Sequence, residues 1–199
     1  MFLYWLTRFL FGIFARIFFR LKVEGEENLP KEGGFILAAN HASSLDPFVI
    51  SAAMPFYIRW LVIYEYYDQG HFKPLLKWMR LIRVKNNLPK EAFRALLHAE
   101  VIGLFPEGRR TWSGSLGPGR PGAAALARRT SCPVIPLGIL GSFAALARAS
   151  KRLSLHPITV RIGAPLFFSE PANKKDRDRL DEENTRRLMQ TIAELLRGV

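Results

Sequence analysis

The chain has 199 residues and a formal net charge of +12, from 29 Lys and Arg against 17 Asp and Glu, and 49% of its residues are hydrophobic. That length and apolar content predict one domain with its own core and no long disordered tail, and a single cysteine, Cys132, excludes an internal disulfide framework. The charge indicates an anionic partner. Because 15 Phe and 4 Trp accompany it, and no zinc-finger, basic-zipper or RNP pattern is found, a membrane surface is favoured and nucleic acid is not expected.

Residues 1–22 form a strongly apolar segment whose only charges are positive. Its longest uncharged stretch, Phe9 to Ala15, is far shorter than the ~20 apolar residues of a membrane span, so we expect an amphipathic helix that lies in the membrane interface. A helix packed on the domain core and a tilted span remain the alternatives. Secretion is not expected, because a signal peptide carries its cations before the apolar run and here three of them follow it: Arg16, Arg20 and Lys22.

Short apolar runs separated by turn-rich segments predict a series of strands after Gly34. The first run delivers Asn40 and His41 to a strand end. The five predicted strands, each rich in apolar, β-branched or aromatic residues, are Phe35 to Ala39, Tyr57 to Tyr64, Val101 to Phe105, Val134 to Leu140 and Ile158 to Ile162.

Helical patterns lie between and after these strands. They comprise a shared face of Ala92, Phe93, Leu96 and Leu97, the Ala-rich segment Ala123 to Arg129, and an amphipathic C-terminal helix marked by Leu188, Ile192 and Leu195. Residues 169–181 resemble an exposed connection into that last helix. The alternation predicts an α/β fold: a single layered domain with a central mixed sheet flanked by helices, plus the N-terminal amphipathic membrane-associating helix.

The first chemical constellation runs from Asn40 to Pro47, where a buried strand gives way to a helix. Across this turn Asp46 can accept a hydrogen bond from one ring nitrogen of His41, which leaves the other nitrogen to take a proton from a hydroxyl. The structural alternatives are that Asp46 caps the helix ahead of Pro47 and that His41 has no chemical role.

The second constellation, Val101 to Thr111, is an apolar strand that stops at Pro-Glu-Gly and opens into paired arginines. Arginine offers a planar fork of donors for a phosphate, Gly108 allows close backbone approach, and Glu107 can orient a hydroxyl or an arginine. A solvated turn is the structural alternative.

Together these segments resemble the PlsC-like glycerophospholipid acyltransferase family, of the lysophosphatidic acid acyltransferase type. The family pattern is an Asn-His-x4-Asp block and then a Phe-Pro-Glu-Gly-x-Arg-Ser block; here Thr111 replaces the serine. The resemblance covers about residues 24–165. The matching segments, in family order, are Asn40-His41 with Asp46, Phe105-Pro106-Glu107-Gly108 with Arg110, Gly119-Arg120-Pro121-Gly122-Ala123, and Val134-Ile135-Pro136-Leu137.

One block departs from the family pattern. Where the family has a strand ending in Asp-Arg or Lys-Arg, the arginine position is occupied by Asn86. Arg83 or Lys85 is then the candidate to help hold the acceptor phosphate. The alternative is an edge strand whose alternating cations face solvent.

The resemblance implies an enzyme of residues 23–199 that moves an acyl chain from acyl-CoA or acyl carrier protein to the free hydroxyl of lysophosphatidic acid. His41 would be the general base and Asp46 would orient it. The substrate-binding residues implied are Glu107, Gly108, Arg109, Arg110 and Thr111, with Arg83 and Lys85. Oxyanion donors are expected among backbone N–H groups near His41.

No cofactor and no metal are expected, since the four histidines show no ligand spacing with one another or with Cys132. The expected location is the cytoplasmic face of the inner (plasma) membrane. Alternatives are acylation of a different lysolipid, such as a lyso-aminolipid, and a non-catalytic membrane-binding module. A hydrolase using Ser43, Ser44 or Cys132 as nucleophile is disfavoured, because no Gly-x-Ser-x-Gly motif is present.

Overall fold

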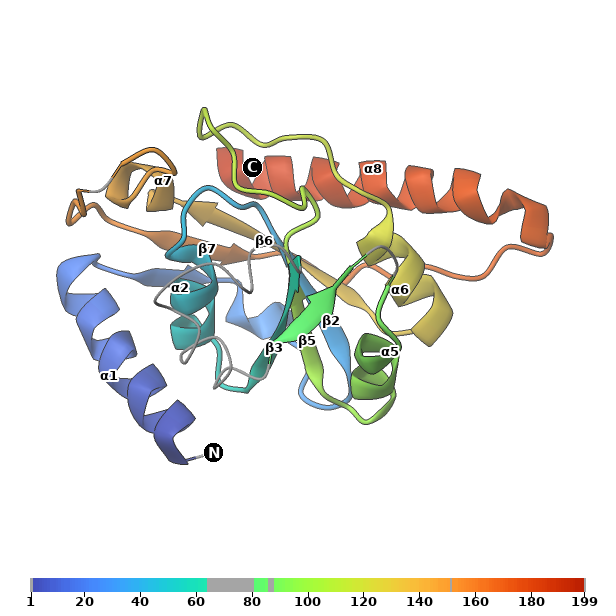
Figure 1. The fold of residues 1–199 in the computed structure, drawn as a ribbon, viewed down its shortest axis with the longest axis horizontal. Helices are drawn as coiled ribbons and strands as arrows, with labels where there is room; N and C mark the ends of the chain where they lie inside the picture. The colour runs from blue at the N-terminus through green and yellow to red at the C-terminus, as the bar shows by residue number, and fades with distance from the viewer. Residues whose placement is uncertain (1, 64–80, 86–87, 151, 199) are drawn as a thin grey trace.

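The computed structural model describes residues 2–63, 81–85, 88–150 and 152–198 (Figure 1). Within these ranges the chain forms one seven-stranded sheet with helices on both of its faces. The predicted fold class, a single layered α/β domain around a mixed sheet, is confirmed.

The elements follow one another along the chain in this way. The strands are β1 (Lys22–Glu24), β2 (Phe35–Ala39), β3 (Ile58–Ile63), β4 (Ile82–Val84), β5 (Val101–Leu104), β6 (Val134–Leu140) and β7 (Thr159–Ile162). The helices are α1 (Phe2–Phe18), α2 (Asp46–Ala53), α5 (Lys90–Leu97), α6 (Gly122–Thr130), α7 (Ser142–Ala145) and α8 (Arg177–Arg197), with 3-10 turns η1 (Glu26–Asn28) and η2 (Lys174–Asp176).

The strand order in the sheet is β1-β7-β6-β2-β5-β3-β4, and every neighbouring pair is parallel except β6 and β7. Strands β6, β2, β5, β3 and β4 therefore point the same way, and their carboxyl ends meet at one edge. In open α/β sheets that edge is where ligands bind. Both sequence blocks that follow β2 and β5 begin there.

The central strand β2 shows how the sheet separates two cores. All five of its residues are buried. Phe35 and Leu37 pack with α1 and α2 on one face, and Ile36 and Ala38 pack with α5, α6 and α8 on the other, as the two-residue period of a strand requires. Figure 1 shows α1 and α2 together on one side of the sheet and the other three helices across it.

Helix α1 is half in the core and half outside it. Ala15 is fully buried, and Phe11 packs against Phe48 of α2 with ring centroids 6.1 Å apart. Arg8 donates to the backbone carbonyls of Ser51 and Met54 at the end of α2, where a cation is favoured by the helix dipole. The outward side is mostly apolar, with Arg16 as its one exposed cation among the described side chains. Each of its large apolar residues is 40–64% exposed: Leu6, Phe9, Leu10, Ile13, Ile17 and Phe18. No helix in the described part of the chain is long and apolar enough to cross a membrane.

The predicted strands agree with the structure to within one residue at their described ends; Tyr64 lies outside the described residues. Two expectations are wrong. Leu97 is 72% exposed, because Ala95 takes its place on the buried side of α5. The segment 169–181 is not all connection, because the Asn173 side chain accepts from the N–H of Lys175 to open η2, and α8 follows at Arg177.

Candidate active site

The His41 ring meets the Asp46 carboxylate at the carboxyl edge of β2. Asp46 Oδ2 lies 2.8 Å from His41 Nδ1, and the Asp46 side chain is fully buried while 17% of the His41 side chain is exposed. An ionised carboxylate only accepts hydrogen bonds, so Nδ1 carries the proton and Nε2 is left as an acceptor. A ring held in this way can remove a proton from a hydroxyl at Nε2.

The Asp46 carboxylate also shapes the turn before it. Oδ2 accepts the backbone N–H groups of Ala42 and Ser43, each at 2.8 Å. The N-cap of α2 is Leu45, and no side chain caps it, so the capping alternative for Asp46 is wrong: its carboxylate points back into the turn toward His41. These two N–H groups are thereby occupied, and so is that of His41, which donates to Glu107. In this structure, therefore, none of these three N–H groups is free to stabilise an oxyanion.

Stacked aromatic rings fix the plane of the His41 imidazole. His41 lies on Phe105 at 3.8 Å between centroids and 9° between planes, and Phe105 lies on Trp60 at 5.0 Å and 13°. Trp60 is buried and donates its indole N–H to Ser51 Oγ in α2 at 3.1 Å. The ring is therefore oriented by three parallel strands and a helix, a support that sequence reasoning missed because the stack joins residues far apart in the chain.

Asn40 fastens the end of β2 to β6. Its side-chain amide donates to the carbonyl of Ile139 at 3.0 Å and accepts the N–H of the same residue at 2.7 Å. These two bonds extend the pairing of β2 with β6 by one residue, with a side chain in place of the backbone. The position of His41, the next residue, is set by this contact.

Glu107 joins the two sequence blocks through backbone contacts. Oε1 accepts the N–H of His41 at 2.8 Å and Oε2 accepts the N–H of Gly117 at 2.9 Å, and Glu107 is itself buried. The N–H of Thr111 in turn donates to the carbonyl of His41 at 2.8 Å. The structure thus brings together the two blocks that the sequence places 66 residues apart.

Gly108 occupies a turn that favours glycine. Its φ is +68°, and a Cβ there would lie 2.9 Å from Nε of Arg120. The N–H of Arg120 donates to the carbonyl of Pro106 at 2.8 Å. The third sequence block therefore folds back over the second before α6 begins.

The paired arginines lie on the open side of this turn. Arg109 is exposed and Arg110 is half-buried, and neither forms an ion pair with any residue in the described ranges. Because Glu107 is engaged with backbone N–H groups, it forms no salt bridge with them. The N–H of Thr111, the next residue, binds the His41 carbonyl, so this loop carries two uncompensated guanidinium groups that suit a phosphate. Thr111 Oγ1 lies 3.4 Å from Ser113 Oγ.

Arg83 and Lys85 belong to the edge strand β4 and its end, and both are exposed. The sheet order places β4 three strands from β2, a separation of roughly 14 Å at the usual strand spacing. They therefore lie along the same carboxyl edge as His41, farther from it than the arginines after β5. Asn86 lies outside the described residues.

The nucleophiles of the hydrolase alternative are placed differently. Ser43 is fully buried and donates its hydroxyl to the carbonyl of Leu146 at 2.7 Å, and Cys132 Sγ lies 3.6 Å from the carbonyl of Thr130. Ser44 is exposed. Within the described ranges, no three or more His, Cys, Asp or Glu side chains gather as metal ligands would.

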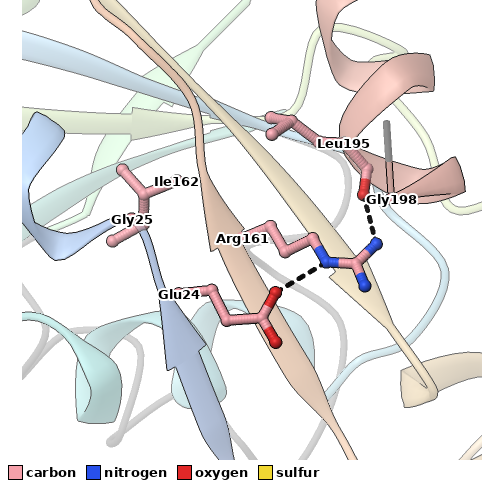
Figure 2. A pocket seen from close by; sticks show the side chains of 6 residues that line it. All are labelled: Glu24, Gly25, Arg161, Ile162, Leu195 and Gly198. Carbon is pink, nitrogen blue, oxygen red and sulfur yellow. Dashed lines mark hydrogen bonds and ion pairs between the residues drawn. The ribbon is translucent and has the colours of Figure 1, made fainter.

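A hollow at the edge of the sheet, where β1, β7 and α8 meet, belongs to the scaffold. Figure 2 shows Arg161 reaching between Glu24 Oε2, at 2.8 Å from Nε, and the carbonyl of Leu195, at 2.9 Å from Nη1. The cation lies at the carboxyl end of α8, where it offsets the helix dipole. None of the residues that line this hollow belongs to the sequence blocks.

Comparison with known proteins identifies the class. The Acyltransferase family model matches residues 20–140, more than half of the chain, and includes the His41, Glu107 and β6 blocks. The chain belongs to this family, and the prediction of an acyltransferase is confirmed.

Individual relatives narrow the resemblance. The 1-acyl-sn-glycerol-3-phosphate acyltransferase of Bacillus subtilis (strain 168) is 26% identical over 181 residues, covering 88% of this chain and 87% of that protein. The enzyme of the same name from Cocos nucifera is 29% identical over 154 residues, covering 73% of this chain and 49% of that one. The crystal structure of the 1-acyl-sn-glycerophosphate (LPA) acyltransferase PlsC from Thermotoga maritima shares the fold, with a TM-score of 0.73 at 21% identity, over 94% of this chain and 78% of that chain.

Proposed function

We propose that the protein transfers an acyl chain from acyl-CoA or acyl carrier protein to the free hydroxyl of lysophosphatidic acid, giving phosphatidic acid. The single observation that carries the proposal is the buried Asp46 carboxylate 2.8 Å from His41 Nδ1. The loop that binds the His41 carbonyl through Thr111 adds two arginines with no described ion-pair partner. The names of the relatives, which act on 1-acyl-sn-glycerol-3-phosphate, support the choice of acceptor.

In the proposed mechanism His41 acts as general base and Asp46 orients it. Nε2 takes the proton of the acceptor hydroxyl as its oxygen attacks the thioester carbonyl carbon, and the carbon–sulfur bond then breaks as the carbonyl re-forms. The imidazolium returns its proton to the departing thiolate, so the products are the ester and a free thiol. Asp46 stabilises the imidazolium while it exists.

Arg109 and Arg110 hold the acceptor phosphate in this proposal, with Gly108 allowing the backbone close to it. Two guanidinium forks with uncompensated charge match a phosphate dianion better than they match a neutral head group. Arg83 or Lys85, on the same sheet edge, is the second cation group, and the Asn86 substitution leaves a different lysolipid, such as a lyso-aminolipid, as the alternative acceptor.

The N-terminal helix brings the enzyme to its substrate in this proposal. Residues 1–22 form the interface segment and residues 23–199 the acyltransferase domain. The outward side of α1 is apolar, with Phe9 62% and Ile17 64% exposed, and lysophosphatidic acid resides in the same interface. The membrane face is the cytoplasmic one, where acyl-CoA and carrier proteins are found; labelling of an N-terminal tag from the outside face would contradict this.

The decisive experiment measures acyl transfer to lysophosphatidic acid in detergent with each donor. His41→Ala is expected to lower kcat by about a thousandfold, because a general base is lost. Arg110→Ala is expected to raise the acceptor KM by roughly thirtyfold, the loss of charge-assisted hydrogen bonds. The matched controls are Arg94→Ala, at an exposed position of α5, and His98→Ala, at the exposed residue that follows α5; both keep wild-type values.

Three results would contradict the proposal. If the folded wild type acylates another lysolipid and not lysophosphatidic acid, the proposed acceptor is wrong. A His41→Ala enzyme that retains its kcat would remove the general base. Inactivity with both donors and every lysolipid would remove the reaction.

A further inference from the structure

A short segment after α7, Leu146–Arg148, contacts both catalytic blocks. The Leu146 carbonyl accepts the Ser43 hydroxyl at 2.7 Å, and Ala147 pairs with Ser43 as an isolated antiparallel bridge. From the next residue, the Arg148 Nη1 donates to the carbonyl of Arg110 at 2.9 Å. Ser43 lies two residues from His41, so one segment contacts the turn after His41 on one side and the arginine loop on the other.

The Arg148 guanidinium is committed to the arginine loop. It lies over the ring of Trp112, 4.0 Å from the centroid, in addition to its bond to Arg110. It is half-buried and forms no ion pair with a carboxylate in the part of the chain that the structure describes. Its described contacts therefore converge on residues 110–112.

The peptide unit between Arg110 and Thr111 is held at both ends. Its carbonyl accepts from Arg148, and its N–H, on Thr111, donates to the carbonyl of His41 at 2.8 Å. These two contacts restrain the rotation of the peptide plane and tie the backbone at Arg110 to that of His41. The loop that carries the Arg110 side chain then has less backbone freedom to lose when that side chain binds an anion.

We propose that Arg148 is a positioning residue for the acceptor phosphate, acting through the Arg110–Thr111 peptide and Trp112. The inference rests on the proposed function, in which Arg110 binds that phosphate. Arg148 does not touch the substrate; it orders the loop that does.

Arg148→Met removes the hydrogen bond and the cation–π contact and nearly keeps the length of the side chain. The acceptor KM for lysophosphatidic acid is expected to rise about tenfold while kcat changes less than about twofold, because only the ordering of the binding loop is lost. Arg148→Lys restores part of the loss, since an ammonium keeps the charge and one donor but not the planar fork. Arg152→Met, an exposed arginine four residues on, is the control and leaves KM unchanged.

A double variant separates positioning from direct binding. If Arg148 acts through Arg110, adding Arg148→Met to Arg110→Ala raises KM no further. Effects that multiply would mean that Arg148 itself binds the phosphate, and a fall in kcat at constant KM would mean that it serves the base; either result overturns the proposal. Trp112→Leu, at a side chain 66% exposed, tests the contact in a variant with little core packing to lose, and a KM rise of about threefold is expected.

Limited trypsin digestion tests the contact between Arg148 and the arginine loop without an assay of acyl transfer. Cleavage after Arg109 and Arg110, followed by mass spectrometry, is expected to be several times faster in Arg148→Met than in wild type or Arg152→Met. If wild type does not acylate lysophosphatidic acid, the proposed function fails but this measurement still stands. Unchanged cleavage in a folded Arg148→Met protein would overturn the positioning role even if the enzyme proves active.

Discussion

Helices α1 and α8, at the two ends of the chain, are both amphipathic and yet face opposite surroundings. On α8 the core positions Leu188 and Ile192 are fully buried and the outward positions are mostly charged. On α1 the core position Ala15 is fully buried, but the outward positions other than Arg16 are mostly apolar, including Phe9 and Ile17. The sheet separates the two helices (Figure 1).

The buried sides of the two helices do not explain this difference. Each helix buries one apolar stripe against the same sheet, so contact with the core explains why each helix forms. Only the second face distinguishes them: charged residues on α8 suit water, whereas large apolar residues exposed together on α1 suit a lipid interface. Of the two cations of α1, Arg8 is directed inward, to the carbonyls at the end of α2, and Arg16 is exposed.

The largest expected effect tests the α8 side. Arg128 of α6 donates to both carboxylate oxygens of Asp181 on α8, at 2.8 Å each, and also pairs with Glu170. The hydrogen bonds that it donates to Asp181 raise the pKa of Arg128. Arg128→Met leaves Asp181 buried without its partner and should cost about 3 kcal/mol of unfolding free energy, a fall in Tm of about 10 °C. Thermal denaturation measures it.

The matched control for that change is Arg179→Met. Arg179 is 77% exposed and pairs with Asp176 at 3.6 Å, so its loss should change the unfolding free energy by less than about 0.5 kcal/mol. Vesicle binding should be unchanged in both variants. Equal losses of stability would show that burial does not distinguish the two pairs.

The next effect tests the outward side of α1. Phe9→Glu with Ile17→Glu should lower affinity for anionic phospholipid vesicles by about a hundredfold, because two insertable side chains become charged. Tm should change little, since both side chains are exposed in the isolated protein. Co-sedimentation measures the binding. Leu97→Glu with Phe167→Glu is the control, because it changes large apolar residues of similar exposure, 72% and 67%, elsewhere on the surface. Equal loss there would refute a specific role for α1.

The smallest effect is a pH dependence on the α8 side. Burial acts to raise the pKa of Glu170, but its hydrogen bonds and charge attraction to Arg128 and then Arg177 prevail and lower it below 4.5. A carboxyl with a lowered folded pKa stabilises the fold above its unfolded pKa and loses that contribution as pH falls through the folded value. Tm of Glu170→Gln should therefore lie below wild type at neutral pH, with the gap closing in acid. A gap independent of pH would exclude the charge as its cause.

The elements that the sequence predicts well are those with a strong hydrophobic pattern. Strands β2 and β6 have the predicted bounds because their buried runs end at turn residues. Strands β1 and β4 and helix α7 span only three or four residues, too few for a periodicity, and the pairing that stabilises them comes from segments far away in the chain. Helix α5 shows a limit of such patterns. Its apolar residues share one face, but the pattern does not say which edge of that face is buried, and Leu97 is exposed.

In the site, the sequence predicts the partners but not their supports. The proximity of His41 and Asp46 follows from five positions across a turn. The stack of His41 on Phe105 and Trp60 does not, and neither does the use of Glu107 as a bridge between backbone N–H groups. Arg148 carries no local pattern at all, since its partners are set by the path of the chain after β6.

The contacts around His41 also bear on the order of folding. His41 is fixed by Glu107, 66 residues away, the preceding Asn40 by Ile139, 99 residues away, and Ser43 by Leu146, 103 residues away. Contacts of such separation require closure of long loops, which makes them late and slow to form. The catalytic geometry is therefore absent from any state in which β2, β5 and β6 are not yet side by side, and the return of enzymatic activity during refolding reports completion of the whole sheet.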